Sequence, residues 1–262
     1  MFRLSPTIKG ILIVNVVVFI MQMMFKSLGI TEYLAMYRLD SIYFHPYQFF
    51  TYMFAHAGFS HILFNMLGLV FLGVTLEQVW GGKKFLIFYV LSGMGAGVFY
   101  ALIGLAQTSG LKSDINEYMV SPSPENFMVL VDGHKKYFEQ IEFRGGMNIY
   151  DFIDEYDENP EMYKSESVSI AENVKSSFVT RYGGRVIGAS GAVYAILMAF
   201  GMLFPDRQLM LLFPPIPIKA KYLVFILGGI AIYMGINQPG DQIAHLVHLG
   251  GMVFAYLLVK FW

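Results

Sequence analysis

Long apolar runs separated by short polar segments predict most of the architecture of this chain. A helix that crosses the hydrocarbon core of a bilayer needs roughly 20 mostly apolar residues, and six stretches approach that length. They lie at residues 8–28, 58–77, 84–106, 187–204, 220–237 and 242–261. We therefore expect an all-α polytopic membrane protein with a bundle of six transmembrane helices. The first run has no small-residue cleavage site, which favours an uncleaved anchor over a signal peptide.

The polar positions concentrate in one segment between the third and fourth runs. Residues 107–181 hold 14 of the 19 Asp and Glu residues of the chain, and this predicts a soluble acidic insert. The expected domains are therefore 1–106 with three spans and the first outer loop, 107–181 as the insert, and 182–262 with the last three spans.

Within the insert the pattern leaves two alternatives open, an α+β fold and a loosely folded or partly disordered loop. Residues 126–134 and 137–143 are typical of two strands around a turn at Asp132-Gly133. Residues 165–182 predict a helix that ends at Gly183-Gly184, with Ser169 and Glu172 at the spacing of a capping box.

Composition supports a membrane protein and excludes several kinds of chemistry. The chain is 56% hydrophobic and 14% charged, whereas soluble domains contain about a quarter charged residues. It has no cysteine, which excludes disulfides, thiolate catalysis and cysteine-ligated metals. The acidic balance of the insert argues against a nucleic-acid partner.

Basic residues of the short loops predict the orientation. Lys and Arg accumulate in cytoplasmic loops, and one set of loop ends carries most of them. These residues are Arg3, Lys9, Lys83, Lys84, Arg207, Lys219, Lys221 and Lys260. We expect an integral protein of the cytoplasmic (plasma) membrane with both termini in the cytoplasm. The insert and the loop 29–57 then lie outside.

Several polar side chains lie inside the predicted spans, where they are costly and often functional. His61 and Asn65 are four residues apart, so a helix places them on one face. In the predicted topology, His61, Asn65, Ser190 and His248 fall in one layer of the outer leaflet on three spans. Hydrogen bonds between helices are the simpler explanation for any one of them alone.

Small residues explain how Ser190 and His248 could meet. Gly191, Ala195 and Ala199 recur every four residues after Ser190, and Gly251 and Ala255 follow His248. Such stripes let transmembrane backbones approach closely, which would bring a hydroxyl to an imidazole that can act as its base. Tyr194, one turn after Ser190, could pack on the imidazole and fix its plane. Taken alone, these stripes also fit a plain packing interface.

No third catalytic residue and no metal site are expected. Asp241 is seven residues from His248, too far along a helix for a direct bond, so the sequence suggests a dyad. His245 and His248 could share a face and hold a metal, but no carboxylate lies at a matching depth, and Asp241 lies at the rim.

Three motifs together resemble the rhomboid family of intramembrane serine proteases. They are His61-Ile-Leu-Phe-Asn65, Gly188-Ala-Ser-Gly191 and Ala244-His-Leu-Val-His-Leu-Gly-Gly251. The resemblance extends over the six spans and not over the insert, and it implies a six-helix rhomboid-like bundle.

The resemblance also implies a role for each matching residue. Ser190 would be the nucleophile and His248 the general base. His61, Asn65 and the Ser190 N–H would donate to the oxyanion, Gly188 would line the site, and Tyr194 would stack on His248. Supporting roles remain for His245, Gly191 and Gly251.

The activity that the resemblance implies is cleavage of single-span membrane proteins near the outer face, with no cofactor. Two features depart from the family: Tyr47-Gln48-Phe49 replaces a Trp-Arg pair before Phe50-Thr51, and the insert replaces a short connection. Two other classes of protein fit these residues less well. A catalytically silent relative that binds transmembrane clients would usually lack Ser190 or His248, and a transporter would need polar residues that continue toward the cytoplasm.

Overall fold

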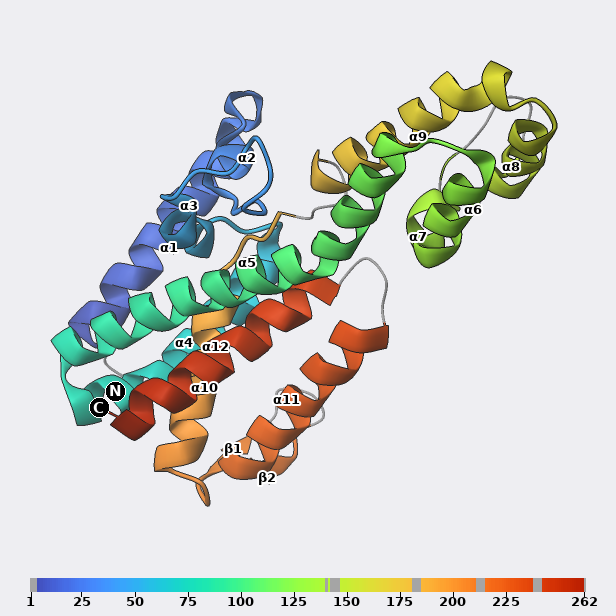
Figure 1. Ribbon diagram of the computed structural model, residues 1–262. Helices are drawn as coiled ribbons and strands as arrows, with labels where there is room; N and C mark the ends of the chain where they lie inside the picture. The colour runs from blue at the N-terminus through green and yellow to red at the C-terminus, as the bar shows by residue number, and fades with distance from the viewer. Residues whose placement is uncertain are drawn as a thin grey trace. The chain divides into compact units, whose positions relative to one another are not determined.

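The computed structural model describes residues 4–139, 141, 147–180, 185–210, 215–237 and 242–261. They form two compact units joined through the chain (Figure 1). The first unit consists of residues 1–37, 43–102 and 185–262, and the second of residues 38–42 and 103–184. Each unit is described separately.

Six helices of the structure correspond to the six predicted spans. Helices α1 (Pro6–Met24), α4 (Phe59–Trp80) and α5 (Gly82–Val120) are long and apolar enough to cross a membrane. Helices α10 (Ser190–Leu203), α11 (Ala220–Asn237) and α12 (Gln242–Phe261) are also apolar, with shorter apolar stretches. The prediction of an all-α polytopic membrane protein is confirmed. The third span differs in length, because α5 continues to Val120 instead of ending at residue 106.

In the first unit, α10 lies against α4, α11 and α12 (Figure 1). Its alanines and Phe200 are buried, which fits a helix surrounded by others. A short antiparallel pair, β1 (Gln208–Met210) and β2 (Pro217–Lys219), connects α10 to α11. Between α1 and α4 the chain forms only short turns: η1 (Lys26–Leu28), α2 (Ile30–Leu34), α3 (Gln48–Thr51) and η2 (Tyr52–Phe54).

A buried glutamine holds the backbone of this first loop. Gln48 is 1% exposed. Its side-chain oxygen accepts from the backbone N–H groups of Tyr37 and His45, at 3.3 and 3.2 Å, and its amide donates to the Tyr43 carbonyl at 2.9 Å. One side chain therefore satisfies three backbone groups of the loop.

The second unit is helical, which corrects the prediction of strands in the insert. Its helices are α6 (Pro124–Gly133), α7 (Lys135–Phe138), α8 (Ile149–Glu158) and α9 (Pro160–Thr180). The Asp132-Gly133 pair ends a helix instead of forming a hairpin turn. Ser123 caps α6 by accepting from the Asn126 N–H, and Pro124 follows it at the first helical position, where proline is favoured. Residues 140 and 142–143 of the second predicted strand lie outside the described residues.

The helix predicted at 165–182 exists but begins earlier, at Pro160. Ser169 does not cap it, because its hydroxyl donates to the Ser165 carbonyl within the helix. The capping box instead starts α8, where Asn148 and Asp151 each bond the other's backbone N–H. Gly183-Gly184, the predicted end, lies outside the described residues.

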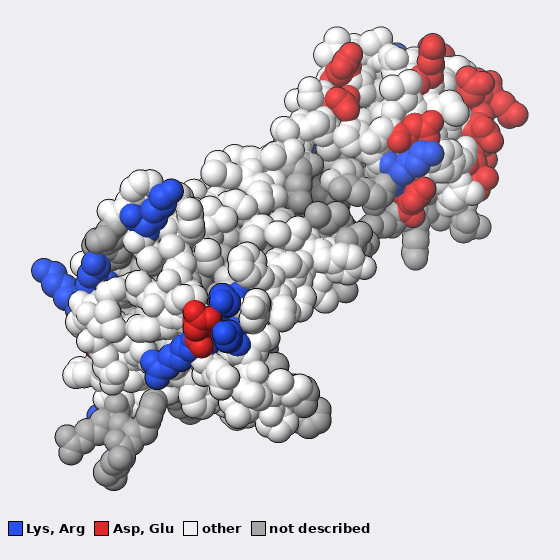
Figure 2. All heavy atoms as spheres, turned by 90° about the horizontal axis from the view of Figure 1, so that it is seen from below, with Lys and Arg blue, Asp and Glu red and all other residues white. Residues whose placement is uncertain are grey.

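A hydrophobic core stabilises the second unit, so its described part is not a loose loop. Phe127 is fully buried and its ring contacts those of Phe138, Phe152 and Tyr156 at centroid distances of 5.8–6.1 Å. On α8, Ile149, Phe152, Ile153 and Tyr156 face this core. The remaining positions of α8 are mostly acidic and exposed, and Figure 2 shows acidic side chains gathered over this unit.

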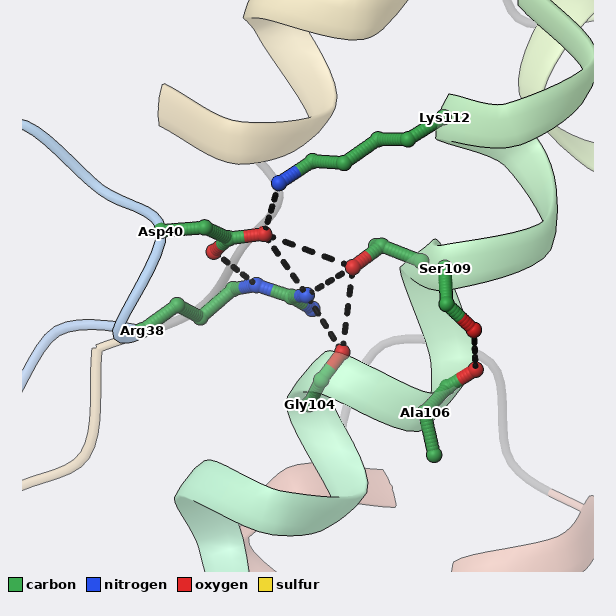
Figure 3. A network of polar contacts seen from close by, with 7 residues as sticks. Arg38, Asp40, Gly104, Ala106, Ser109 and Lys112 are labelled. Carbon is green, nitrogen blue, oxygen red and sulfur yellow. Dashed lines mark hydrogen bonds and ion pairs between the residues drawn. The ribbon is translucent and has the colours of Figure 1, made fainter.

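Residues 38–42 join this unit through a buried ionic network (Figure 3). Arg38 is 3% exposed and donates to Asp40, to the Gly104 carbonyl and to the Thr108 hydroxyl. Lys112 also pairs with Asp40. Burial would raise the pKa of Asp40, but the hydrogen bonds and charges of Arg38 and Lys112 outweigh it and lower the pKa below its usual value.

Candidate active site

Ser190 is the first residue of α10 and follows a backbone conformation that requires glycine. Gly188 has a φ of 121°, and its N–H donates to the Tyr52 carbonyl at 2.8 Å. A Cβ at this position would lie 2.7 Å from two ring atoms of His61. Both the conformation and the space therefore restrict this position to glycine.

The Ser190 hydroxyl lies 2.8 Å from Nε2 of His248, which is on α12. Two glycines allow α10 and α12 to come this close. A Cβ on Gly251 would collide with the carbonyl oxygen of Gly191. A Cβ on Gly191 would lie 3.3 Å from Cγ1 of Val247 on α12, and 2.7 Å from Cβ of Ala96 on α5. Small side chains thus bring the hydroxyl and the imidazole together.

The imidazole of His248 is held by stacking. The Tyr194 ring lies parallel to it, with centroids 4.1 Å apart and planes 3° apart. His245 meets the same ring edge-on, with centroids 6.1 Å apart. Nδ1 of His248 is buried and has no hydrogen-bond partner among the described residues. Asp241 lies outside them. The described arrangement is thus a serine–histidine pair oriented by an aromatic ring.

The side chains of His61 and Asn65 lie beside Gly188, which precedes Ser190 by two residues in the chain. The Ala57 N–H donates to Nδ1 of His61 at 3.3 Å, so the neutral ring carries its hydrogen on Nε2. The Asn65 amide donates one hydrogen to the His61 carbonyl at 3.0 Å. A Cβ on Gly188 would lie 2.7 Å from His61 Nε2 and 3.8 Å from Asn65 Nδ2. Two hydrogen-bond donors therefore converge next to the serine.

The structure adds two residues for which the sequence reasoning assigned no role. His56 is 3% exposed and its Nε2 accepts from the Ala189 N–H at 3.5 Å. Its ring contacts His61 edge-on, with centroids 5.1 Å apart. Gln22 of α1 bonds the backbone N–H and carbonyl of His56. The polarity of Gln22 within an apolar span was the one signal that could have pointed to it. Among the described residues, no group of His, Asp and Glu has the arrangement of a metal site.

Comparisons with known proteins show which sequences the chain resembles. The Rhomboid domain family model matches residues 43–121 and 166–261. The rhomboid protease GlpG of Klebsiella pneumoniae is 30% identical over 93 residues, which are 36% of this chain and 34% of that protein. The rhomboid protease AarA of Providencia stuartii is 39% identical over 49 residues, 19% of this chain and 17% of that protein. RHOMBOID-like protein 1 of Arabidopsis thaliana is 38% identical over 63 residues, 24% of this chain and 16% of that protein.

The aligned stretches span at most 34% of these relatives. The family model is matched over more than half of the chain, in two segments that leave out residues 122–165 of the insert. The first matched segment contains His61 and Asn65, and the second contains Ser190 and His248. The chain is therefore a polytopic membrane protein that belongs to the rhomboid family.

Proposed function

We propose that the protein is an intramembrane serine endopeptidase in which Ser190 is the nucleophile and His248 the general base. The observation that carries this proposal is the 2.8 Å contact between the Ser190 hydroxyl and Nε2 of His248. A serine is a weak nucleophile unless a base within hydrogen-bond reach takes its proton. Two of the related proteins are named rhomboid proteases, which supports the same activity.

The chemistry starts when Ser190 Oγ attacks the carbonyl carbon of the scissile peptide bond and its proton moves to Nε2 of His248. The tetrahedral intermediate collapses when the C–N bond breaks and His248 gives this proton to the leaving amine. Water then attacks the Ser190 ester, and His248 takes one of its protons. The C–O bond of the ester breaks, and the proton returns to Ser190. No cofactor takes part in these steps.

Negative charge develops on the carbonyl oxygen during each attack. His61 Nε2–H, the second hydrogen of the Asn65 amide and the Ser190 backbone N–H would donate to this oxyanion. The tautomer of His61 that Ala57 imposes is the one this role needs. Tyr194 would keep the His248 ring in one plane while it gains and loses its proton.

The substrates would be single-span membrane proteins, cut near the outer face of the bilayer. Basic residues in the short loops support an orientation with both termini in the cytoplasm. A transmembrane helix must unwind to expose a peptide bond, so small or helix-breaking residues near the cleavage site are expected in substrates.

A catalytically silent relative that binds transmembrane clients is the alternative. The presence of both Ser190 and His248 at hydrogen-bond distance argues against it. A silent relative would keep the fold and the client, but its serine would have no enhanced nucleophilicity.

The test is labelling of the full chain in detergent with a fluorophosphonate probe, which reacts with activated serines. We expect the wild type to be labelled and Ser190→Ala and His248→Ala to be unlabelled. Ser109→Ala is the matched control, because Ser109 is exposed and, among the described residues, its hydroxyl bonds only the Ala106 carbonyl of its own helix (Figure 3). Labelling that persists in Ser190→Ala would exclude the nucleophile, and an unlabelled, folded wild type would favour the silent relative.

A further inference from the structure

The second unit carries a groove that the proposed chemistry does not use. It lies between the last turns of α5 and the helix α6, and its volume is about 600 Å³. Tyr118 and Leu130 line it and belong to the buried core, since each is 3% exposed. The groove thus lies against the packed core of this unit.

Two valines that line the groove expose most of their side chains. Val120 is 86% exposed and Val129 is 69% exposed. Both line the same groove, one from α5 and one from α6. An apolar side chain of another chain seated in the groove would cover both valines and remove their apolar area from water.

The polar neighbours of these valines are acidic. Asp114 and Glu117 line the groove from successive turns of α5. Asp114 accepts from Nε2 of His134 at 2.7 Å, whereas Glu117 is in no ion pair within the described part of the chain. Lys175 reaches the same stretch of α5 but donates to the Asn116 side chain at 2.6 Å. The surrounding unit is acidic as well (Figure 2), which adds attraction for cations at longer range.

We propose that this groove binds a peptide segment in which Lys or Arg lies next to a small apolar side chain. The cation would meet Glu117 and Asp114, and the apolar side chain would cover Val120 and Val129. This proposal rests on the proposed protease function, since the segment would be the flank of a single-span substrate that lies outside the membrane. The groove would then select substrates by a sequence that lies away from the peptide bond that is cut.

Peptide binding tests the groove without any catalysis. The probe is a fluorescein-labelled peptide with lysine-valine pairs spaced by serine and glycine, and its affinity for the full-length Ser190→Ala variant is measured by anisotropy. We expect Glu117→Lys to weaken binding by roughly fivefold or more. Glu158→Lys on α8 makes the same change in net charge away from the groove, and it should weaken binding much less.

Two variants that replace exposed apolar side chains test the contribution of the valines. Val129→Ser should weaken binding of the same probe, whereas Met162→Ser, which also changes an exposed apolar side chain, should not. A probe with glutamate in place of lysine should bind far more weakly than the lysine probe. Equal effects of Glu117→Lys and Glu158→Lys, or equal binding of the two probes, would overturn the groove assignment.

Cleavage then tests the link to substrates. Two single-span substrates share one transmembrane segment and differ only in an outer flank with lysine-valine or glutamate-valine pairs. We expect a higher kcat/KM for the lysine flank and loss of this preference in Glu117→Lys. If neither substrate is cut while the probe binds at Glu117, the protease proposal fails and the groove remains. If both are cut equally, the substrate role of the groove fails and the protease proposal stands.

Discussion

At the residue scale, the candidate site relies on stacking and backbone contacts where soluble serine proteases use a third polar residue. An aspartate usually orients the histidine of a triad. Here the parallel ring of Tyr194 and the edge of His245 enclose the His248 ring, and Nδ1 has no partner among the described residues. The plane of the imidazole therefore depends on packing, and substitutions that change packing should change turnover.

Replacement of Tyr194 tests this dependence. Tyr194→Phe keeps the ring, so we expect kcat within about twofold of the wild type. Tyr194→Ala removes the stack, which is worth about 0.5–1.5 kcal/mol between aromatic rings, and kcat should fall roughly tenfold. The measurement is cleavage of one transmembrane substrate by both variants. Equal turnover of Tyr194→Phe and Tyr194→Ala would contradict an orienting role for the ring.

Replacement of Asn65 tests the oxyanion donors. Asn65→Ala removes one proposed donor, which typically costs about 10²–10³ in kcat, while Ser190 remains labelled by a fluorophosphonate at a reduced rate. KM should change little, because the oxyanion forms only during the reaction. Asn173→Ala, an exposed amide on α9, is the control. A loss confined to KM would instead assign Asn65 to substrate binding.

At the element scale, the sequence predicted the membrane helices far better than the insert. A span needs only length and apolar composition, and each of the six runs became a helix. In the insert, Val129, Val131 and the Asp132-Gly133 pair favoured a hairpin, but the Ser123-Pro124 cap and the packing of Phe127 decide for helix. Tertiary contacts of this kind override local preference.

Part of the candidate site could be predicted from the sequence, because its residues recur at regular spacing. Regular spacing put His61 and Asn65 on one face and small residues along two spans, and the structure shows α10 and α12 in contact at Gly191 and Gly251. The roles of His56 and Gln48 had no such signal, because each acts through backbone groups of an irregular loop. Irregular backbone has no period from which a contact can be deduced.

The close contact of α10 with α12 predicts that one added methyl group on α12 disrupts the site. Gly251→Ala places a Cβ against the Gly191 carbonyl, so α12 must move and His248 must leave Ser190. We expect fluorophosphonate labelling to fall by at least tenfold, because the serine loses its base. Gly229→Ala on α11, where a Cβ meets nothing within 4 Å, should label like the wild type. Full labelling of Gly251→Ala would show that α10 and α12 can accommodate the methyl group without separating Ser190 from His248.

At the scale of the whole molecule, a stretch of the first loop belongs to the insert. Asp40 pairs with Arg38, two residues before it, and with Lys112, 72 residues after it. Since the folded state lowers the pKa of Asp40 below its usual 3.8, its pairing stabilises the fold above about that pH. The contribution is lost as the pH falls through the lower, folded pKa.

Asp40→Asn tests this linkage. We expect the variant to melt below the wild type at neutral pH, because Arg38 loses its buried partner. The difference in melting temperature should stay constant above pH 5 and shrink as the pH falls from about 3.8 through the lower pKa of the folded state, where the wild-type carboxyl also becomes neutral. Asp157→Asn is the control, since that carboxyl is exposed and is in no ion pair within the described residues. A difference that grows in acid would reverse the assigned sign.

The length of α10 determines how deep the chemistry would lie. Its 14 residues make a helix of about 21 Å, whereas the hydrocarbon core is about 30 Å thick, so one end falls short by about 9 Å. The charged pair Asp206-Arg207 follows Leu203 and holds that end at the cytoplasmic surface in the proposed orientation, so the shortfall would lie at the end that bears Ser190. Water would have to descend that distance from the outer surface before each ester could be hydrolysed. Lipid chain length then becomes a control on turnover, because a thicker bilayer lengthens the path of water and leaves the serine unchanged.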